Sequence, residues 1–185
     1  MFEKLSINDI INEHYHTLHN FNSKRIKKSE VFFFFIAPTL ISLLCALLSP
    51  LNSTISTITI TIMSIFGALL FNVQILLCDL RIKIKKRMNE VTPQSRDKQE
   101  SEITSQLIKE LYSNVSFGIL TALFEVIIMF FWSLSTAAFS ANCKVYLPLN
   151  YIFSVFSYTI IFWFFITLLM ISKRTHALIT RGEFS

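Results

Sequence analysis

Four long apolar blocks constrain this chain more than any other feature of its sequence. They cover residues 31–49, 55–78, 115–138 and 151–172, and polar segments separate them. At a rise of about 1.5 Å per residue, a helix of roughly 20 residues crosses the apolar part of a bilayer. Membrane barrels instead show strands of about ten alternating residues. The sequence therefore predicts an all-α membrane protein with four transmembrane helices arranged as two hairpins.

Composition supports this prediction and excludes other classes of protein. Charged residues make up 16% of the chain, whereas a soluble domain carries about a quarter. The chain has three Gly, too few for a Gly-rich phosphate-binding loop. Residues 57–62 alternate Thr and Ile as a strand would, but lipid requires every backbone group to be bonded within the segment, so we expect a helix there as well.

Basic residues predict the orientation. All 17 Lys and Arg except Lys144 lie in residues 1–30, 80–114 or 173–185. Cytoplasmic loops carry the excess of Lys and Arg in membrane proteins, so we expect these three segments to be cytoplasmic. The net charge of +5 is then explained by topology and by contact with anionic membrane lipid, and we expect no directly bound nucleic acid.

This orientation predicts cytoplasmic helices as well as spans. Span two should continue as a helix to about Asn89, and after a turn at 91–93 a second helix should run unbroken into span three. The two would form a helical stalk, in which the stripe Ile103, Leu107 and Leu111 needs cover from another helix. The predicted parts are 1–30 (cytoplasmic amphipathic helix and basic segment), 31–79 (hairpin 1), 80–114 (cytoplasmic helical loop), 115–172 (hairpin 2) and 173–185 (cytoplasmic tail).

The N-terminal segment carries apolar residues about one helical turn apart, which is typical of an amphipathic helix. Such a helix can lie on the membrane, pack on the 80–114 loop or bind a partner protein. Basic residues follow this helix and also follow span two, where lipid headgroups of the inner leaflet are expected. The predicted partner or lipid contacts are Ile7, Ile11, His14, Leu18, Lys24, Arg25, Lys27, Lys28, Arg81, Lys83, Lys85, Lys86 and Arg87.

Glu125 is the residue that most suggests chemistry in the membrane. It lies ten residues into span three, about 15 Å deep, where an ionised carboxylate costs roughly 2.5 kcal/mol or more. No other span carries a Lys or Arg in its core. The carboxyl group can be protonated, can bond neutral side chains such as Asn72 and Gln74, or can line water in an oligomer. Hydrogen-bonded helix packing and a functional role both remain open.

Two spans also carry small or polar faces. On span two, Thr57, Thr61, Ser64, Ala68 and Asn72 recur at spacings of three and four residues, and span three has Gly118, Thr121, Ala122, Glu125 and Thr136. Such faces serve helix packing or line a pore. Spans one and four are rich in Phe and are expected to face lipid, with a kink at Pro38 in span one. The candidate pore or gating residues are Glu125, Asn72, Gln74, Thr61 and Ser64.

Other chemistries have little support in the sequence. His14, His16 and His19 do not share one helical face, so we expect no metal site. Cys45, Cys78 and Cys143 form no CxxC motif, although Cys45 and Cys143 are both expected near the outer face. The sequence has no nucleophile–base pair and no paired carboxylates, and we expect neither an enzyme nor a cofactor.

The layout resembles the small four-span membrane effectors of bacterial anti-phage systems, of the SLATT and SMODS-associated types and the membrane component of Hailong-like systems. The shared features are a short polar N-terminal helix (8–21), a basic segment before the first hairpin, and a helix such as 103–112 leading into the second. The resemblance covers the whole chain as architecture. It implies a homo-oligomer in the bacterial inner membrane that permeabilises it or conducts ions, restrained by a cytoplasmic partner or signal.

The sequence leaves other functions open. A colicin-immunity-like or holin-like protein has a similar size, and a non-conducting scaffold subunit would have the same hydropathy pattern. Our prediction is an oligomeric pore lined by spans two and three, with Glu125 as its gating or selectivity group.

Overall fold

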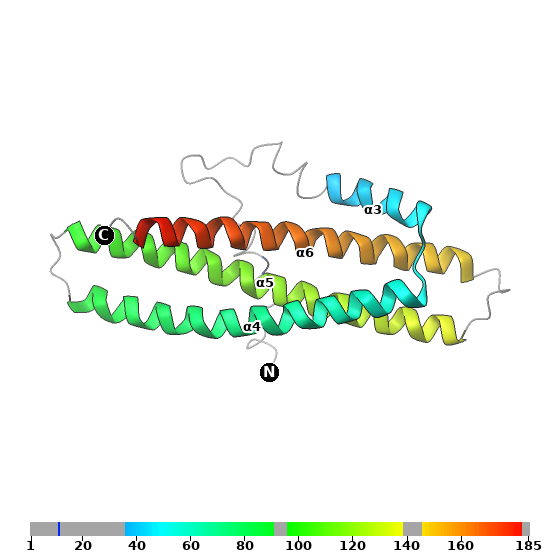
Figure 1. Ribbon diagram of the computed structural model, residues 1–185, viewed down its shortest axis with the longest axis horizontal. Helices are drawn as coiled ribbons and strands as arrows, with labels where there is room; N and C mark the ends of the chain where they lie inside the picture. The colour runs from blue at the N-terminus through cyan, green and yellow to red at the C-terminus, as the bar shows by residue number, and fades with distance from the viewer. Residues whose placement is uncertain (1–10, 12–35, 91–95, 139–145, 183–185) are drawn as a thin grey trace. The chain divides into compact units, whose positions relative to one another are not determined.

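The computed structural model describes residue 11 and residues 36–90, 96–138 and 146–182, and all of its secondary structure there is helical. Four helices follow one another along these ranges: α3 (Ala37–Leu48), α4 (Ser53–Glu90), α5 (Arg96–Ala138) and α6 (Tyr146–Gly182) (Figure 1). The prediction of an all-α chain is confirmed for the described residues. The Thr–Ile alternation at 57–62 lies inside α4, as expected for a segment in lipid.

The long helices continue well beyond the apolar blocks. Helix α4 extends span two to Glu90, and α5 starts at Arg96 and runs without a break through span three, both close to prediction. Helix α6 differs from the prediction at both ends. It starts at Tyr146, which places Pro148 in its first turn, where a proline costs no helical hydrogen bond. It also continues to Gly182, so most of the predicted tail is helical.

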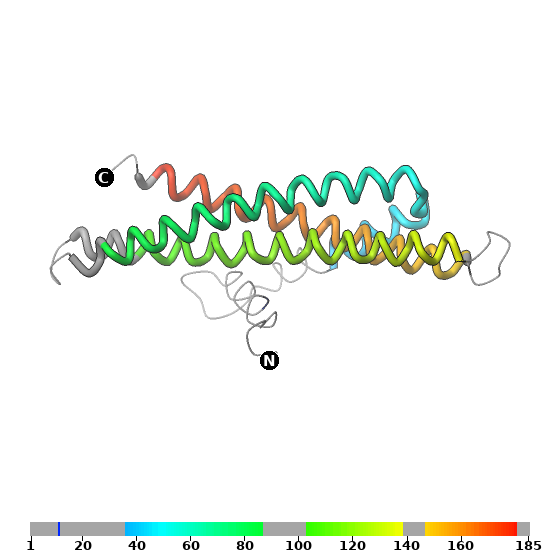
Figure 2. The backbone as a smooth tube through the Cα atoms, turned by 90° about the horizontal axis from the view of Figure 1, so that it is seen from below, coloured from blue at the N-terminus to red at the C-terminus, as the bar shows by residue number. Residues whose placement is uncertain are grey.

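Helix α3 contains the part of the first apolar block that the structure describes. Its 12 residues form about 18 Å of helix at 1.5 Å per residue, and residues 31–35 lie outside the described ranges. Pro38 lies in the first turn of α3, and the predicted kink there, which involves residues 31–35, stays a prediction. The turn 49–52 joins α3 to α4 (Figure 2). Asn52 caps α4 by accepting a hydrogen bond from the backbone N–H of Ile55 at 2.9 Å.

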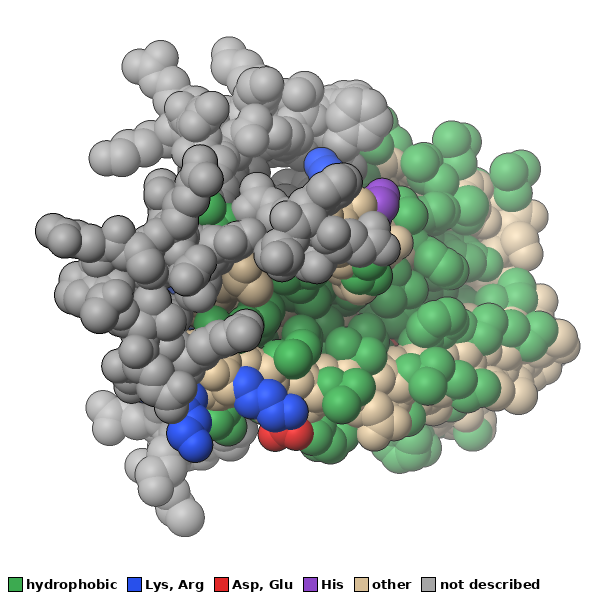
Figure 3. Space-filling model, turned by 60° about the vertical axis from the view of Figure 1, so that its left-hand side comes forward, with side chains coloured by type: hydrophobic (Ala, Val, Ile, Leu, Met, Phe, Trp, Pro, Cys, Tyr) green, Lys and Arg blue, Asp and Glu red, His purple; other side chains and the backbone are tan. Residues whose placement is uncertain are grey.

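Three of the described helices are long and apolar enough to cross a membrane, within Ser53–Lys86, Ile103–Ala138 and Leu147–Thr180. Their outward surfaces are apolar as well: Leu76 is 62% exposed, Phe130 58% and Leu169 71%. Hydrophobic side chains cover much of the described surface in view in Figure 3. Water-soluble monomers rarely expose apolar surface on this scale, which agrees with a membrane protein.

The chain forms two compact units, and α4, α5 and α6 each contribute to both. Unit 1 comprises Met1–Lys24, Leu69–Gly118 and Thr167–Ser185, and unit 2 comprises Arg25–Ala68 and Ile119–Ile166. In unit 1, Leu111 of the predicted stripe is buried, whereas Ile103 and Leu107 are half-buried; Ile108, outside the stripe, is buried as well.

Two polar contacts join helices inside unit 1. Gln74 on α4 donates to the hydroxyl of Ser116 on α5 at 3.0 Å. Arg174 on α6 donates to the backbone carbonyl of Glu110 on α5 at 3.0 Å, and its guanidinium lies 3.4 Å from the Glu110 carboxylate. Each of these contacts ties two of the three long helices together.

In unit 2, small residues let the helices approach closely. A Cβ atom at Gly67 of α4 would lie 3.6 Å from the Cβ of Ala122 on α5, which is the backbone proximity that small residues give in membrane helix pairs. On α3, the buried hydroxyl of Ser42 shares a hydrogen bond of 2.7 Å with Thr159 of α6. The apolar core cluster of this unit consists of Leu51, Met129 and Trp132, with Ile55, Ile60 and Phe153 packed against it.

Candidate functional site

Glu125 lies inside unit 2, where α5 faces α6. Its side chain is fully buried, and the hydroxyl of Ser157 on α6 donates to its Oε1 atom at 2.5 Å. Ser157 is fully buried too. The second carboxyl oxygen, Oε2, is buried and has no hydrogen-bond partner among the described residues. We call this pair the Glu125–Ser157 seam.

The described residues of unit 2 provide no positive charge to balance an ionised Glu125. Among the described residues of unit 2, Glu125 is the single Asp, Glu, Lys, Arg or His. Its neighbours along α5 at one-turn spacing are Thr121, Ala122 and Met129, all buried. An ionised carboxylate in such surroundings has lost its water without gaining a cation, which is the costly case for a buried charge.

The hydrogen bond to Glu125 does not come from the residues that the sequence suggested. Gln74 bonds Ser116 instead, and Asn72 is exposed and belongs to unit 1. A bond to a neutral side chain was one of the three expected arrangements, but Ser157 was not a candidate. A possible signal was the pair Ser154 and Ser157 within the Phe-rich fourth block, since two serines three residues apart share one helical face.

Two other predicted pore residues, Thr61 and Ser64, lie on a different surface, on α4, together with Thr57 of the same predicted polar face. Thr57, Thr61 and Ser64 are exposed, and the exposed Ala68 continues the series; we call Thr57, Thr61 and Ser64 the hydroxyl face. The buried residues of α4 in unit 2 are Ser56, Thr59 and Met63. At about 100° of rotation per residue, Ser64 is turned about 100° from Met63 and Thr61 about 200°. The hydroxyl face therefore points away from the packed side of α4.

The predicted polar faces of spans two and three do not meet within unit 2. Thr121, Ala122 and Glu125 of α5 are buried inside it, whereas the hydroxyl face is on the outside of α4. Two hydroxyls of that face bond within their own helix: Thr57 donates to the carbonyl of Ser53 at 2.9 Å and Thr61 to that of Thr57 at 2.8 Å.

A network of hydrogen bonds holds the turn between α3 and α4 against α5 and α6. Trp132 donates its indole N–H to Asn150 Oδ1 at 2.7 Å, and Asn150 donates to the carbonyl of Leu51 at 3.4 Å. The backbone N–H of Leu51 donates to Ser154 at 2.9 Å, and the Tyr158 hydroxyl donates to the carbonyl of Ser49 at 2.8 Å. This network, which we call the turn clamp, fixes the first hairpin onto the second.

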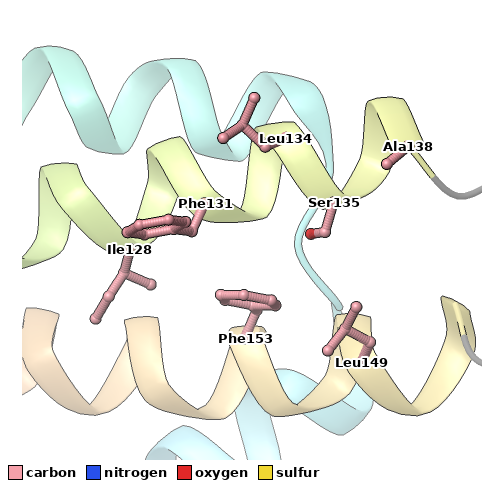
Figure 4. A pocket seen from close by; sticks show the side chains of 7 residues that line it. All are labelled: Ile128, Phe131, Leu134, Ser135, Ala138, Leu149 and Phe153. Carbon is pink, nitrogen blue, oxygen red and sulfur yellow. The ribbon is translucent and has the colours of Figure 1, made fainter.

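Close to the turn clamp, α5 and α6 border an apolar groove of about 600 Å³. Ser135 is the one polar side chain among its lining residues, and Phe131 and Phe153 lie on opposite walls (Figure 4). The lining contains neither Glu125 nor a residue of the hydroxyl face. The Phe residues of span four were expected to face lipid. Phe156 and Phe165 are exposed, Phe153 and Phe162 are half-buried, and Phe164 is 1% exposed, so the expectation is wrong for Phe164.

The predicted partner and lipid contacts are partly visible. The basic residues Arg81, Lys83, Lys85 and Lys86 on α4 are exposed, and Ile11 is helical and half-buried. The side chain of Arg87 and all of the remaining predicted contacts lie outside the described residues: Ile7, His14, Leu18, Lys24, Arg25, Lys27 and Lys28. Cys143, His16 and His19 lie outside them as well, whereas Cys45 and Cys78 are free thiols.

No group of three or more His, Cys, Asp or Glu side chains able to hold a metal ion occurs within the described ranges. Comparisons of the chain with protein-family models, with curated proteins and with solved structures give no match.

Proposed function

We propose that copies of this chain assemble in a membrane into an ion-conducting or depolarising pore. The observation that carries the proposal is the outward position of the hydroxyl face within residues 57–69 of α4, where the other exposed side chains are apolar. Lipid tails offer no hydrogen-bond partners to a row of hydroxyl groups, whereas water or a second copy of the chain can offer them. In this arrangement Thr57, Thr61 and Ser64 border the conducting path.

Glu125 has a different part in this proposal from the lining residues. Because it is buried at the α5–α6 contact, it acts on the pore through the packing of these helices and not by meeting ions in the path. We keep it as the gating residue. Asn72, exposed on α4 in unit 1, is a further candidate for contact with water, while Gln74 is engaged with Ser116.

The proposal includes a topology of four spans with residues 1–30 and 173–185 on the cytoplasmic side. The distribution of Lys and Arg supports it. The apolar outer surface of α3 also supports it, since Leu44 is 60% exposed and Leu47 62%. We further propose that Arg81, Lys83 and Lys85 contact anionic headgroups, and that the resemblance to anti-phage effectors extends to control by a cytoplasmic protein or signal in a bacterial inner membrane.

One observation favours a second candidate, a non-conducting scaffold or immunity-like subunit. The hydroxyls of Thr57 and Thr61 already bond backbone carbonyls of their own helix. A threonine bonded in this way tolerates lipid or a packed helix as well as it tolerates water. The two candidates therefore differ in what the hydroxyl face meets, and a flux experiment separates them.

The experiment measures dissipation of a potassium gradient across vesicles that contain the purified chain. We expect the wild type to dissipate the gradient and the double variant Thr61→Leu/Ser64→Leu to lose at least tenfold of that rate. The matched control is Leu69→Ile, a change at an exposed apolar position of α4, which should keep the rate. Flux that is absent from the wild type at matched protein content would support the scaffold. Equal flux in all three proteins would place the conducting path away from the hydroxyl face and contradict its role.

A further inference from the structure

Glu125 is a buried acid that the conducting path does not use. Its Oε1 atom accepts from Ser157, its Oε2 atom is buried without a partner among the described residues, and both side chains are fully buried. A carboxylate carries two oxygens that each need donors or a cation. A protonated acid needs a donor at its carbonyl oxygen and an acceptor for its O–H group. The seam provides the donor, so protonation leaves a neutral O–H group, and not a negative charge, without a partner among the described residues.

Among the described residues of unit 2, no side chain is a base that accepts this proton. The other titratable side chains described in unit 2 are Cys45 on α3 and Tyr151 and Tyr158 on α6, and α4 carries none there. Tyr158 is engaged at its hydroxyl with Ser49. Thiol and phenol groups do not carry a positive charge, so none of them offsets a negative charge on Glu125.

We propose that Glu125 is a proton-binding site that locks α5 to α6. In the locked state the carboxyl group is neutral, Ser157 donates to Oε1 as the carbonyl oxygen, and Oε2 carries the proton. On release, the O–H bond at Oε2 breaks, its electron pair stays on the carboxylate, and the proton passes to water. The resulting charge draws water into the seam and loosens α5 from α6. The ligand of the site is thus a single proton.

The lock has a defined relation to the proposed pore. Its gating part rests on the proposed function, because loosening α5 from α6 matters for conduction only if the chain conducts. Its proton-binding part rests on the seam alone. A failure of the flux experiment therefore leaves proton binding in place, and a failure of the experiment below leaves conduction in place.

The first test is infrared spectroscopy of the purified chain in vesicles at pH 7. We expect the carbonyl band of a protonated carboxylic acid in the wild type and its loss in Glu125→Gln. Glu110→Gln, which removes a half-buried acid in unit 1, should leave the band in place. Ser157→Ala should keep the band and move it to higher frequency, because the carbonyl oxygen loses its donor. A wild-type spectrum without an acid band that depends on Glu125, or a band that Ser157→Ala leaves unmoved, would overturn the assignment.

The second test follows the lock in the unmutated seam. Spin labels at Phe124→Cys on α5 and Phe156→Cys on α6 occupy exposed positions next to Glu125 and Ser157, in a background without native cysteines. Raising the pH until the acid band disappears should lengthen the distance between the labels. The same labels in Glu125→Gln, which has no proton to release, should show no change. An unchanged distance in the Glu125 protein, or an equal change in both proteins, would overturn the lock.

Discussion

The turn clamp permits a specific prediction, because the buried indole of Trp132 and the half-buried amide of Asn150 depend on one another. Trp132 is 5% exposed and its indole N–H has Asn150 as partner at 2.7 Å. Replacing Asn150 with Leu, of similar size, leaves this donor unpaired and also removes the 3.4 Å bond to Leu51. A stranded buried polar group costs about 1–3 kcal/mol, and side-chain hydrogen bonds between membrane helices contribute about 0.6 kcal/mol on average and up to about 1.7.

We therefore expect Asn150→Leu to lower the free energy of unfolding by about 1–3 kcal/mol. Trp132→Phe should lower the free energy of unfolding by a similar amount, because it leaves the amide oxygen of Asn150 without its donor. The double variant replaces both polar partners with apolar groups, a change that is often nearly neutral for the hydrogen bond itself. Its loss should therefore be smaller than the sum of the two single losses by about 1 kcal/mol.

The assay is reversible unfolding of the purified chain in mixed micelles, with helical circular dichroism as the signal, for the wild type, both single variants and the double variant. Residues that do not interact add within about 0.3–0.5 kcal/mol. If the double variant loses the full sum within that margin, Trp132 and Asn150 are not coupled and the clamp does not hold the turn. Ser154→Ala, which removes the acceptor of the Leu51 N–H, is a third probe of the same clamp and should also destabilise.

Three further changes test other contacts in the same unfolding assay. Gly67→Ala should be tolerated or slightly stabilising, because the new Cβ would lie 3.6 Å from Ala122 and Ala favours helix by about 1 kcal/mol relative to Gly. Gly67→Leu should instead separate α4 from α5 and lower the stability. Equal stability of the two variants would contradict this contact. Glu110→Gln should lower the free energy of unfolding by about 1 kcal/mol or less. Arg174→Met should lower it more, because it also removes the hydrogen bond to the Glu110 carbonyl at 3.0 Å. The reverse order would refute the contact. Ser157→Ala should cost about 1 kcal/mol both in the wild type and in Glu125→Gln if Glu125 is neutral; a clearly larger cost in the wild type would indicate an ionised carboxylate.

Much of the helical framework is predictable from hydropathy. The apolar blocks placed α4, α5 and α6 correctly. Residues 78–90 and 103–115 contain no Gly or Pro, which indicated that the helices extend beyond the apolar blocks. Helix ends were less predictable. Pro148 looked like part of a loop, although a proline in the first turn is compatible with a helix start.

Which side of each helix packs was much harder to predict. In water, an apolar face marks the core, but lipid is as apolar as Leu or Phe, so hydrophobicity does not distinguish inside from outside. Phe164 and Phe165 show this directly, because the first is 1% exposed and the second 49%. The same reasoning explains why Ser157 was not recognised as the partner of Glu125: only the rotation of α6 about its axis brings the two together.

The central claim is that the hydroxyl face of α4 meets water in the assembled protein. The most direct measurement compares Ser64→Cys with Leu69→Cys, each in a background without native cysteines, during potassium flux from vesicles. Both positions are exposed on α4, but they lie about 140° apart around the helix. A membrane-impermeant thiol reagent needs a hydrated thiolate, so we predict that it labels Ser64→Cys and blocks flux, and that it leaves Leu69→Cys unlabelled and conducting. Equal labelling at the two positions, or labelling at Ser64→Cys without any effect on flux, would contradict the account.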